Sequence, residues 1–122
     1  MIALAVVVLL AAETPAAATP YERAVLEYAD FSWVETPRSE DFERFYPETT
    51  GRKLETLIVL RCTVANAGRL ERCVVEQAPD RDYGFAKATL RLANKFRIDH
   101  RTRSGESTRG RVVRVPVRWM VP

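Results

Sequence analysis

The central part of the chain alternates between apolar and polar side chains, a pattern typical of a half-buried β-strand. The alternation runs from Thr56 to Val64. The apolar positions in this segment are Ile58, Leu60, Cys62 and Val64. A strand that turns one face to a core has this period of two. A second strand-like segment runs from Leu70 to Glu76, and the intervening Asn66-Ala67-Gly68 supplies turn residues. The pattern predicts an antiparallel hairpin.

The register of this hairpin decides whether the two cysteines of the chain, Cys62 and Cys73, can meet. A two-residue loop, Ala67-Gly68, places them opposite each other. A three-residue loop that ends at Gly68 places Cys62 opposite Arg72, and a bulge near Arg72 must then return Cys73 to the shared face. Two interpretations stay open: a Cys62–Cys73 disulfide, or two buried reduced thiols that pack as small apolar side chains.

The segment from Gly84 to Arg97 has the period of an amphipathic helix. Its apolar residues recur at steps of three and four and are Phe85, Ala88, Leu92 and Phe96. The opposite side carries Lys87, Arg91 and Lys95. This distribution predicts a helix that lies across a sheet.

The last strand-like segment follows Gly110 and ends near Trp119. Its apolar face consists of Val113, Val115, Val117 and Trp119. Pro116 interrupts the other face and has no N–H to donate, which predicts a strand at the edge of the sheet. Arginine and proline on an exposed edge also protect it from pairing with other chains.

Three shorter segments complete the described pattern. A short helix is predicted from Ser39 and ends before Pro47. We interpret its aromatic cluster, Phe42, Phe45 and Tyr46, as core at one end of the sheet, with a ligand-stacking surface as the less favoured alternative. Residues 19–36 are expected to form an N-terminal arm, and residues 97–110 a polar loop that nothing in the sequence orders.

The N-terminal segment indicates export. Residues 1–12 are uncharged and apolar, and the small residues Ala16 and Ala18 match the pattern of a signal-peptidase site. We expect a signal peptide at residues 1–18, with an uncleaved membrane anchor as the alternative. An exported chain meets an oxidising compartment, which favours the disulfide over free thiols.

Composition narrows the classes of function. The chain has 122 residues, 19 basic and 16 acidic, with a net charge of +3 that shows no concentrated basic patch, so no nucleic-acid partner is expected. The only histidine, His100, lies in the predicted polar loop, which disfavours a Cys/His nucleophile and hence an enzyme. One histidine and two cysteines do not complete a zinc site. No metal, cofactor or small-molecule substrate is predicted.

The order of these elements resembles the C-terminal domain of the TonB energy-transducer family. The resemblance covers about residues 37–120, within a single domain taken as residues 37–122. It rests on Tyr46-Pro47, the hairpin IVLRCTVANAGRLERCVV, the helix FAKATLRLANKFR and the strand RVVRVPVRWM. It implies an α+β fold: a three-stranded antiparallel sheet with one main helix packed on it and a short N-terminal helix. No long proline-rich spacer precedes the domain here, so the resemblance implies binding in transport-related energy transduction and leaves open whether the chain transmits force.

The resemblance also implies an activity, because TonB domains add a peptide of an outer-membrane receptor as a strand beside the last strand of their sheet. The partner-binding residues implied here are Val112, Arg114, Val115, Pro116 and Arg118. The sequence therefore predicts a periplasmic, non-enzymatic module that binds a protein or peptide by strand addition. The alternative is a structural or assembly protein that forms a homodimer through the same edge strand.

Overall fold

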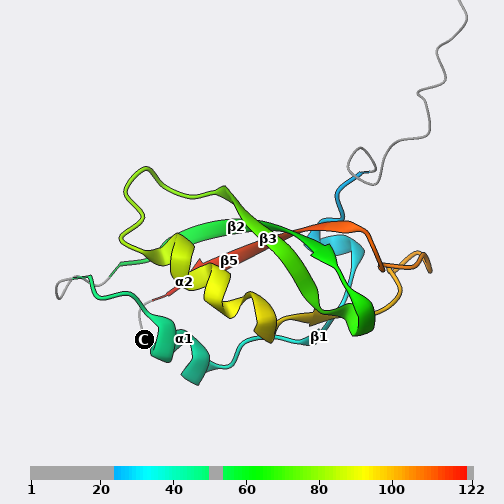
Figure 1. Cartoon of the computed structure of the whole chain (residues 1–122), viewed down its shortest axis with the longest axis horizontal. Coiled ribbons are helices and arrows are strands. Elements are labelled where there is room, and N and C mark those ends of the chain that lie inside the picture. The colour runs from blue at the N-terminus through cyan, green and yellow to red at the C-terminus, as the bar shows by residue number, and fades with distance from the viewer. Residues whose placement is uncertain (1–23, 50–53, 121–122) are drawn as a thin grey trace, which may run out of the picture.

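The chain folds into a helix packed on one face of a small antiparallel sheet, as Figure 1 shows. The computed structural model describes residues 24–49 and 54–120. The predicted signal peptide, residues 1–18, and residues 19–23 of the predicted arm lie outside the described residues. The predicted α+β class is confirmed, with two α-helices and a three-stranded sheet in the described part of the chain.

Strand β2 (Thr56–Val64) is the centre of this sheet. It pairs antiparallel with β3 (Leu70–Gln77) on one side and with β5 (Val112–Trp119) on the other. The register of β2 and β5 sets Leu60 opposite Val115, and both side chains are fully buried. The two apolar faces read from the sequence therefore lie on the same side of the sheet and form the core.

Helix α2 (Phe85–Leu92) continues into the short 3-10 helix η3 (Ala93–Lys95) and covers the apolar face of the sheet. The side chains predicted for its inner face, Phe85, Ala88, Leu92 and Phe96, are all buried. Helix α1 (Ser39–Phe45) packs beside α2. Its start is fixed by the backbone N–H of Arg38, which donates to the Asp41 carboxylate at 2.9 Å.

The aromatic residues of α1, together with Tyr46 directly after it, extend the core at one end of the sheet, as predicted. The ring centres of Phe42 and Trp119 lie 5.1 Å apart, and those of Tyr46 and Phe85 lie 5.3 Å apart. The Trp119 indole N–H donates to the Thr89 hydroxyl at 2.8 Å, so the buried indole has a polar partner. This end of the sheet is closed by aromatic packing.

A second, two-stranded sheet was not predicted. Strand β1 (Trp33–Glu35) lies within the expected arm, and its partner β4 (Arg97–Ile98) lies at the start of the expected polar loop. The prediction that nothing orders this loop is wrong: the Thr108 hydroxyl is buried and donates to the Asp99 carbonyl at 2.8 Å. Single buried hydroxyls and backbone hydrogen bonds order this segment, and they leave no periodic pattern in the sequence.

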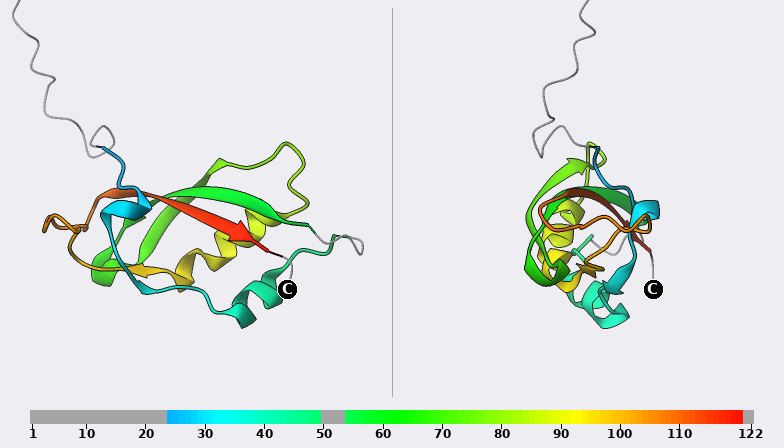
Figure 2. Two further views of the ribbon diagram at one scale, coloured as in Figure 1. Left: turned by 180° about the vertical axis from the view of Figure 1, so that it is seen from behind. Right: turned by 90° about the vertical axis from the view of Figure 1, so that its right-hand side faces the viewer.

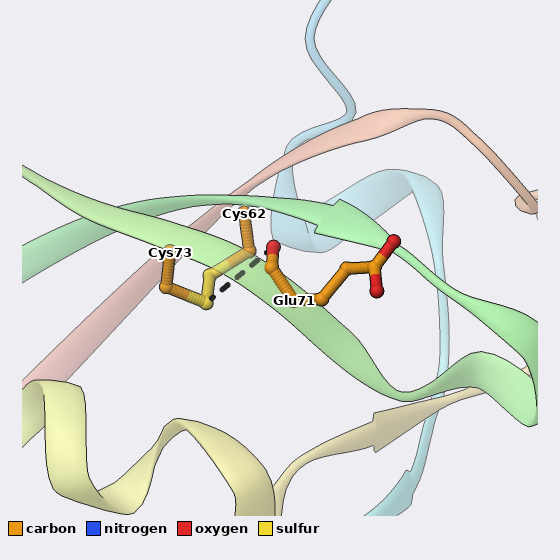
Figure 3. The surroundings of a disulfide bond; sticks show 3 residues. All are labelled: Cys62, Glu71 and Cys73. Atoms are coloured by element: carbon orange, nitrogen blue, oxygen red, sulfur yellow. Dashed lines mark hydrogen bonds between the residues drawn. A yellow bond between two sulfur atoms is a disulfide. The ribbon is translucent and has the colours of Figure 1, made fainter.

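The hairpin adopts the three-residue loop, Asn66–Gly68, closed by a hydrogen bond from the Ala65 N–H to the Arg69 carbonyl at 2.7 Å. Strand β3 then bulges: Arg72 has a φ of 53°, and the register with β2 shifts by one residue. The bulge brings Cys73 beside Cys62, with their Cα atoms 4.1 Å apart, in the disulfide of Figure 3. Of the two interpretations left open, the disulfide is confirmed.

Candidate strand-pairing edge

The candidate functional site is the outer edge of β5, which has no further strand of its sheet beside it in the described part of the chain. In an antiparallel pair, successive residues turn their N–H and C=O groups alternately toward and away from the neighbour. The Val112 carbonyl and the Arg114 N–H both bond a residue outside the sheet, Leu26. The backbone groups of Pro116 and Arg118, which follow at steps of two, face the same outer edge.

The first part of this edge is already paired. The Leu26 N–H donates to the Val112 carbonyl at 2.9 Å, and the Arg114 N–H donates to the Leu26 carbonyl at 2.9 Å. Leu26 thus forms a parallel bridge with Val113, and its side chain is buried in the core. A segment from the N-terminal arm behaves here as a one-residue strand added to the sheet.

Pro116 limits how far this parallel pairing can extend. A parallel strand that continued past Leu26 would first donate its own N–H to the Arg114 carbonyl and would then need a hydrogen bond from the backbone nitrogen of residue 116. Proline has no N–H at this atom. The chain turns away into the 3-10 helix η1 (Tyr28–Asp30) instead.

The second part of the edge offers free backbone groups. The carbonyls of Arg114, Pro116 and Arg118 and the amide of Arg118 face outward, and none bonds to another backbone group within residues 24–49 and 54–120. The side chains of Pro116 and Arg118 are exposed. An extended chain placed here would mostly donate hydrogen bonds, because only one amide on this part of the edge can donate to it.

Arg114 joins the edge to the solvent face of the sheet. Its guanidinium donates to both carboxylate oxygens of Glu76 on β3, at 3.0 Å for the Nη2 contact, and also to Glu27. Arg61 on β2 pairs with the same Glu76 carboxylate at 2.9 Å. The hydrogen bonds from Arg114, followed by the charges of Arg114 and Arg61, hold the pKa of Glu76 below its usual value.

The Glu76 and Glu27 carboxylates act in the opposite direction on Arg114 and raise the pKa of its guanidinium. The guanidinium is therefore a permanent cation on this face. Its three hydrogen bonds to carboxylate oxygens orient the side chain across three segments of the chain, namely β5, β3 and the arm. The occupied part of the edge is thus braced by charge as well as by the Leu26 bridge.

The five residues implied by the TonB resemblance differ in how far the structure exposes them. Val115 is fully buried and Val112 is 8% exposed, so their side chains belong to the fold. Arg114 is held by Glu76 and Glu27. Pro116 and Arg118 present both side chain and backbone to the outside. The open part of the predicted site therefore centres on Pro116 and Arg118.

Sequence reasoning missed three residues that shape the site: Leu26, Glu27 and Glu76. Leu26 is an aliphatic residue in a segment without a period, and the contact it makes is with backbone atoms that are distant in the sequence. Glu27 and Glu76 lie 87 and 38 positions from Arg114, and acidic residues on a strand or an arm are ordinarily solvated. No local signal distinguishes them.

The opposite edge of the sheet, formed by β3, is less suited to accept a strand. Its pairing with β2 shifts register twice, between Val59 and Leu60 and between Arg61 and Thr63. Each shift inserts an extra residue into β3 and disturbs the even spacing that an added strand needs. The bulge at Arg72 positions Cys73 for the disulfide, so this register shift is part of how the hairpin is built.

Other chemistry has few candidate groups in the described chain. The sulfurs of both cysteines, Cys62 and Cys73, form the disulfide. The Cys73 sulfur also lies 4.0 Å from the Glu71 carbonyl oxygen, a contact drawn as a dashed line in Figure 3. The His100 ring is exposed and contacts the Asp99 carboxylate at 3.1 Å. Within residues 24–49 and 54–120, no three His, Cys, Asp or Glu side chains cluster closely enough to hold a metal ion.

None of the helices in the described residues is both long and apolar enough to cross a bilayer. Comparison with known proteins gives 33% identity over 60 residues with an uncharacterized protein of Caulobacter vibrioides. The match covers 49% of this chain and 60% of that protein, so the chain spans about three-fifths of the relative's length. No protein-family model matches the chain, and no solved structure matches it.

Proposed function

We propose that this chain is a periplasmic, non-enzymatic module that binds an extended peptide by adding it as a strand to the outer edge of β5. One observation carries the proposal: Leu26 already pairs with this edge as an added strand does, while the edge from the Arg114 carbonyl to Arg118 has no backbone partner among the described residues. Main-chain hydrogen bonds supply the affinity in this mode of recognition, and neighbouring side chains supply the selectivity.

The order of the elements supports a domain of TonB C-terminal type. Helix α1, the β2–β3 hairpin, helix α2 and the closing strand β5 follow one another as in that family. We infer from this order that the partner is a segment of an outer-membrane receptor or a related transport protein. The disulfide and the apolar residues 1–12 support export to the periplasm.

The side chains on the open edge favour an acidic segment in the partner. The Arg118 guanidinium is exposed and forms no ion pair within the described residues. A carboxylate placed on the adjacent strand would lie within reach of it, and opposite charges across neighbouring strands are favourable. Because Pro116 has no backbone N–H, the peptide residue opposite it does not need a carbonyl that accepts a hydrogen bond from the edge.

Two substitutions at one position separate strand addition from side-chain recognition. Arg118→Pro removes the only outward amide on the open edge but spares the bonds to β2, because those come from the residues on either side. Arg118→Ala keeps the amide and removes only the guanidinium. Fluorescence anisotropy with labelled synthetic peptides that copy periplasmic segments of outer-membrane receptors measures the affinity of each variant.

We expect Arg118→Pro to weaken binding at least tenfold, because the lost hydrogen bond and the ring both oppose the added strand, and Arg118→Ala to weaken it by about threefold. Thermal melts of both variants establish that the sheet is intact. Equal losses in both variants would indicate that the side chain, not the backbone, is recognised. Tight binding that survives both substitutions would place the peptide elsewhere and overturn the proposal.

A homodimer that pairs through β5 is the competing use of the same edge. Sedimentation velocity over a range of concentrations distinguishes the two functions. The binding module is expected to sediment as a monomer with its edge available. A dimer that persists at low concentration in the wild type and dissociates in Arg118→Pro would assign the edge to self-assembly.

A further inference from the structure

A cleft of about 200 Å³ opens between the hairpin turn and the loop that joins β4 to β5. Residues 65–68 of the turn line one side, and residues 100–101 and 107–109 of the loop line the other. Figure 2 shows the turn in green and the loop in orange at the same end of the molecule. The open edge near Arg118 lies at the other end of β5, so the cleft is a separate site (Figure 1).

The lining of the cleft carries positive charge and no described carboxylate. Arg101 and Arg109 line it from the loop side. Both side chains are exposed, and neither guanidinium forms an ion pair with any described residue. Residues 97–111, to which they belong, contain five arginines and two acidic residues and so carry +3 (5 minus 2).

The two acidic residues of this segment already have partners. The Arg111 guanidinium donates to the Glu106 carboxylate at 3.3 Å. The Asp99 carboxylate accepts the Arg101 N–H at 3.2 Å and contacts the His100 ring at 3.1 Å. Neither acidic residue lines the cleft, so the guanidinium groups there are left for an external anion.

Backbone amides add further donors at the cleft. Four of the residues that line it have a backbone N–H that donates to no acceptor within residues 24–49 and 54–120. They are Asn66, Ala67, Ser107 and Arg109. Ala67 adopts a left-handed conformation, with φ of 61° and ψ of 18°. Turns of this kind gather N–H groups into concavities that bind anions.

The two sides of the cleft are held together by hydrogen bonds. The Gly110 N–H of the loop donates to the Val64 carbonyl beside the turn at 2.8 Å. Within the loop, the Thr108 N–H donates to the His100 carbonyl at 3.0 Å. The cleft is therefore formed before a ligand arrives, and binding does not have to order it.

We propose that this cleft binds the phosphate group of a small organic molecule. Guanidinium groups bind phosphate through parallel N–H donors, and a phosphate ester offers three acceptor oxygens to donors on both sides of the cleft. Ala65 and Ala67 add small apolar side chains on the turn side, which suit the organic part of the ester. Pockets for drug-sized ligands occupy roughly 300–1,000 Å³, so a cleft of about 200 Å³ takes a small ligand.

Isothermal titration calorimetry of the full chain at neutral pH tests this proposal. The probes are inorganic phosphate, glycerol phosphate and acetate, each added at constant ionic strength in sodium chloride. The test variant combines Arg101→Gln and Arg109→Gln. The matched control combines Arg69→Gln and Arg103→Gln, which removes the same charge from the hairpin and the loop at positions that do not line the cleft.

We expect each lost guanidinium to weaken phosphate binding by about tenfold, so the test variant should lose roughly a hundredfold and the control less than about threefold. Glycerol phosphate should bind more tightly than inorganic phosphate, because its carbon atoms contact apolar side chains. In a two-dimensional NMR titration of the wild type with glycerol phosphate, the largest amide shifts should fall on residues 65–68 and 100–109. Circular dichroism melts establish that both variants are folded.

Four results would overturn the proposal. Equal losses in the test variant and the control would reduce the effect to net charge without a location. Acetate that binds as tightly as phosphate would assign the cleft to carboxylates. Weaker binding of glycerol phosphate than of inorganic phosphate would leave a site for the free ion only. The largest amide shifts outside residues 65–68 and 100–109, or the absence of binding by the wild type, would remove the site from this cleft.

Discussion

The two ends of strand β5 are held in place by different kinds of interaction. Its last residue, Trp119, is 1% exposed and packs against the rings of Phe42, Tyr46 and Phe85. Its first residues are held by the backbone bridge to Leu26 and by the carboxylates around Arg114. One end is stabilised by removal of apolar surface from water, and the other by directional polar contacts.

This difference explains why strand addition is proposed at only one end of β5. Non-directional apolar burial fixes the aromatic end without using the outer backbone groups of β5, so the edge near Arg118 stays available. The loop end uses the outer groups of Val112 and Arg114 for its own bridge, and what it presents to the outside is charge. A strand can therefore be added at the end near Arg118, while the outer groups at the loop end are already paired.

The largest effect should follow from breaking the aromatic end. Trp119→Ala removes a fully buried side chain that contacts three rings, and it leaves the buried Thr89 hydroxyl without its indole donor. We expect a loss of about 4 kcal/mol in the free energy of unfolding, measured by urea denaturation. The adjacent Met120 is 63% exposed and serves as the control, with Met120→Ala costing less than about 0.5 kcal/mol. A loss at Trp119 as small as that at Met120 would contradict its place in the core.

The aromatic end is also the part of the fold that the sequence predicts well. The helical period of Phe85, Ala88 and Leu92 and the alternation along β5 both give the correct buried faces. Apolar burial imposes a period on the sequence because each element turns one side to the core. The α+β class and the packing of the aromatic cluster follow from that period.

The polar end was predicted less well because the contacts that form it are single and distant in the sequence. Two loop lengths were possible for the hairpin, and the choice depends on Gly68, which packs against the backbone of Ile98 on β4. The candidate site was found in part: Pro116 marks the edge strand by its chemistry alone. The Leu26 bridge that divides the edge depends on backbone atoms, which are the same in every residue type.

A smaller but specific loss is expected from Gly68→Ala at the polar end. Gly68 has a φ of +77°, and a Cβ there would lie 1.9 Å from the Ile98 carbonyl oxygen, so the hairpin turn would have to move away from β4. We expect a loss of about 3 kcal/mol in the free energy of unfolding.

Gly105 offers a matched control for that substitution. Its φ is +92°, but a Cβ would meet nothing within 4 Å. Gly105→Ala should therefore cost only the backbone strain, about 1 kcal/mol. The difference between the two variants in a urea titration measures the contact between the turn and β4, and equal losses would mean that this contact does not stabilise the fold.

The smallest effect should come from the ion pairs that brace the occupied part of the edge. Glu76→Gln removes the carboxylate shared by Arg114 and Arg61, whose side chains are partly exposed, and should cost about 0.5 to 1 kcal/mol at pH 7. The pKa of Glu76 is lowered in the folded state by its bonds to Arg114, from a usual value of 4.5. The wild type therefore has the full stabilisation from the Glu76 ion pairs above about pH 4.5. It loses this stabilisation as the pH falls through the lowered pKa of Glu76.

The pH dependence of the difference between wild type and Glu76→Gln identifies the ion pairs, since a purely structural defect has no reason to titrate. Chemical denaturation at pH 7 and near pH 2.5 should show the difference shrinking at the lower pH and in high salt at pH 7. Glu71→Gln on the same strand removes the same charge where no ion pair exists within the described residues, and its stability should stay within about 0.5 kcal/mol of the wild type. A Glu76→Gln deficit that is identical at both pH values would show that the edge is braced by the Leu26 bridge and not by charge.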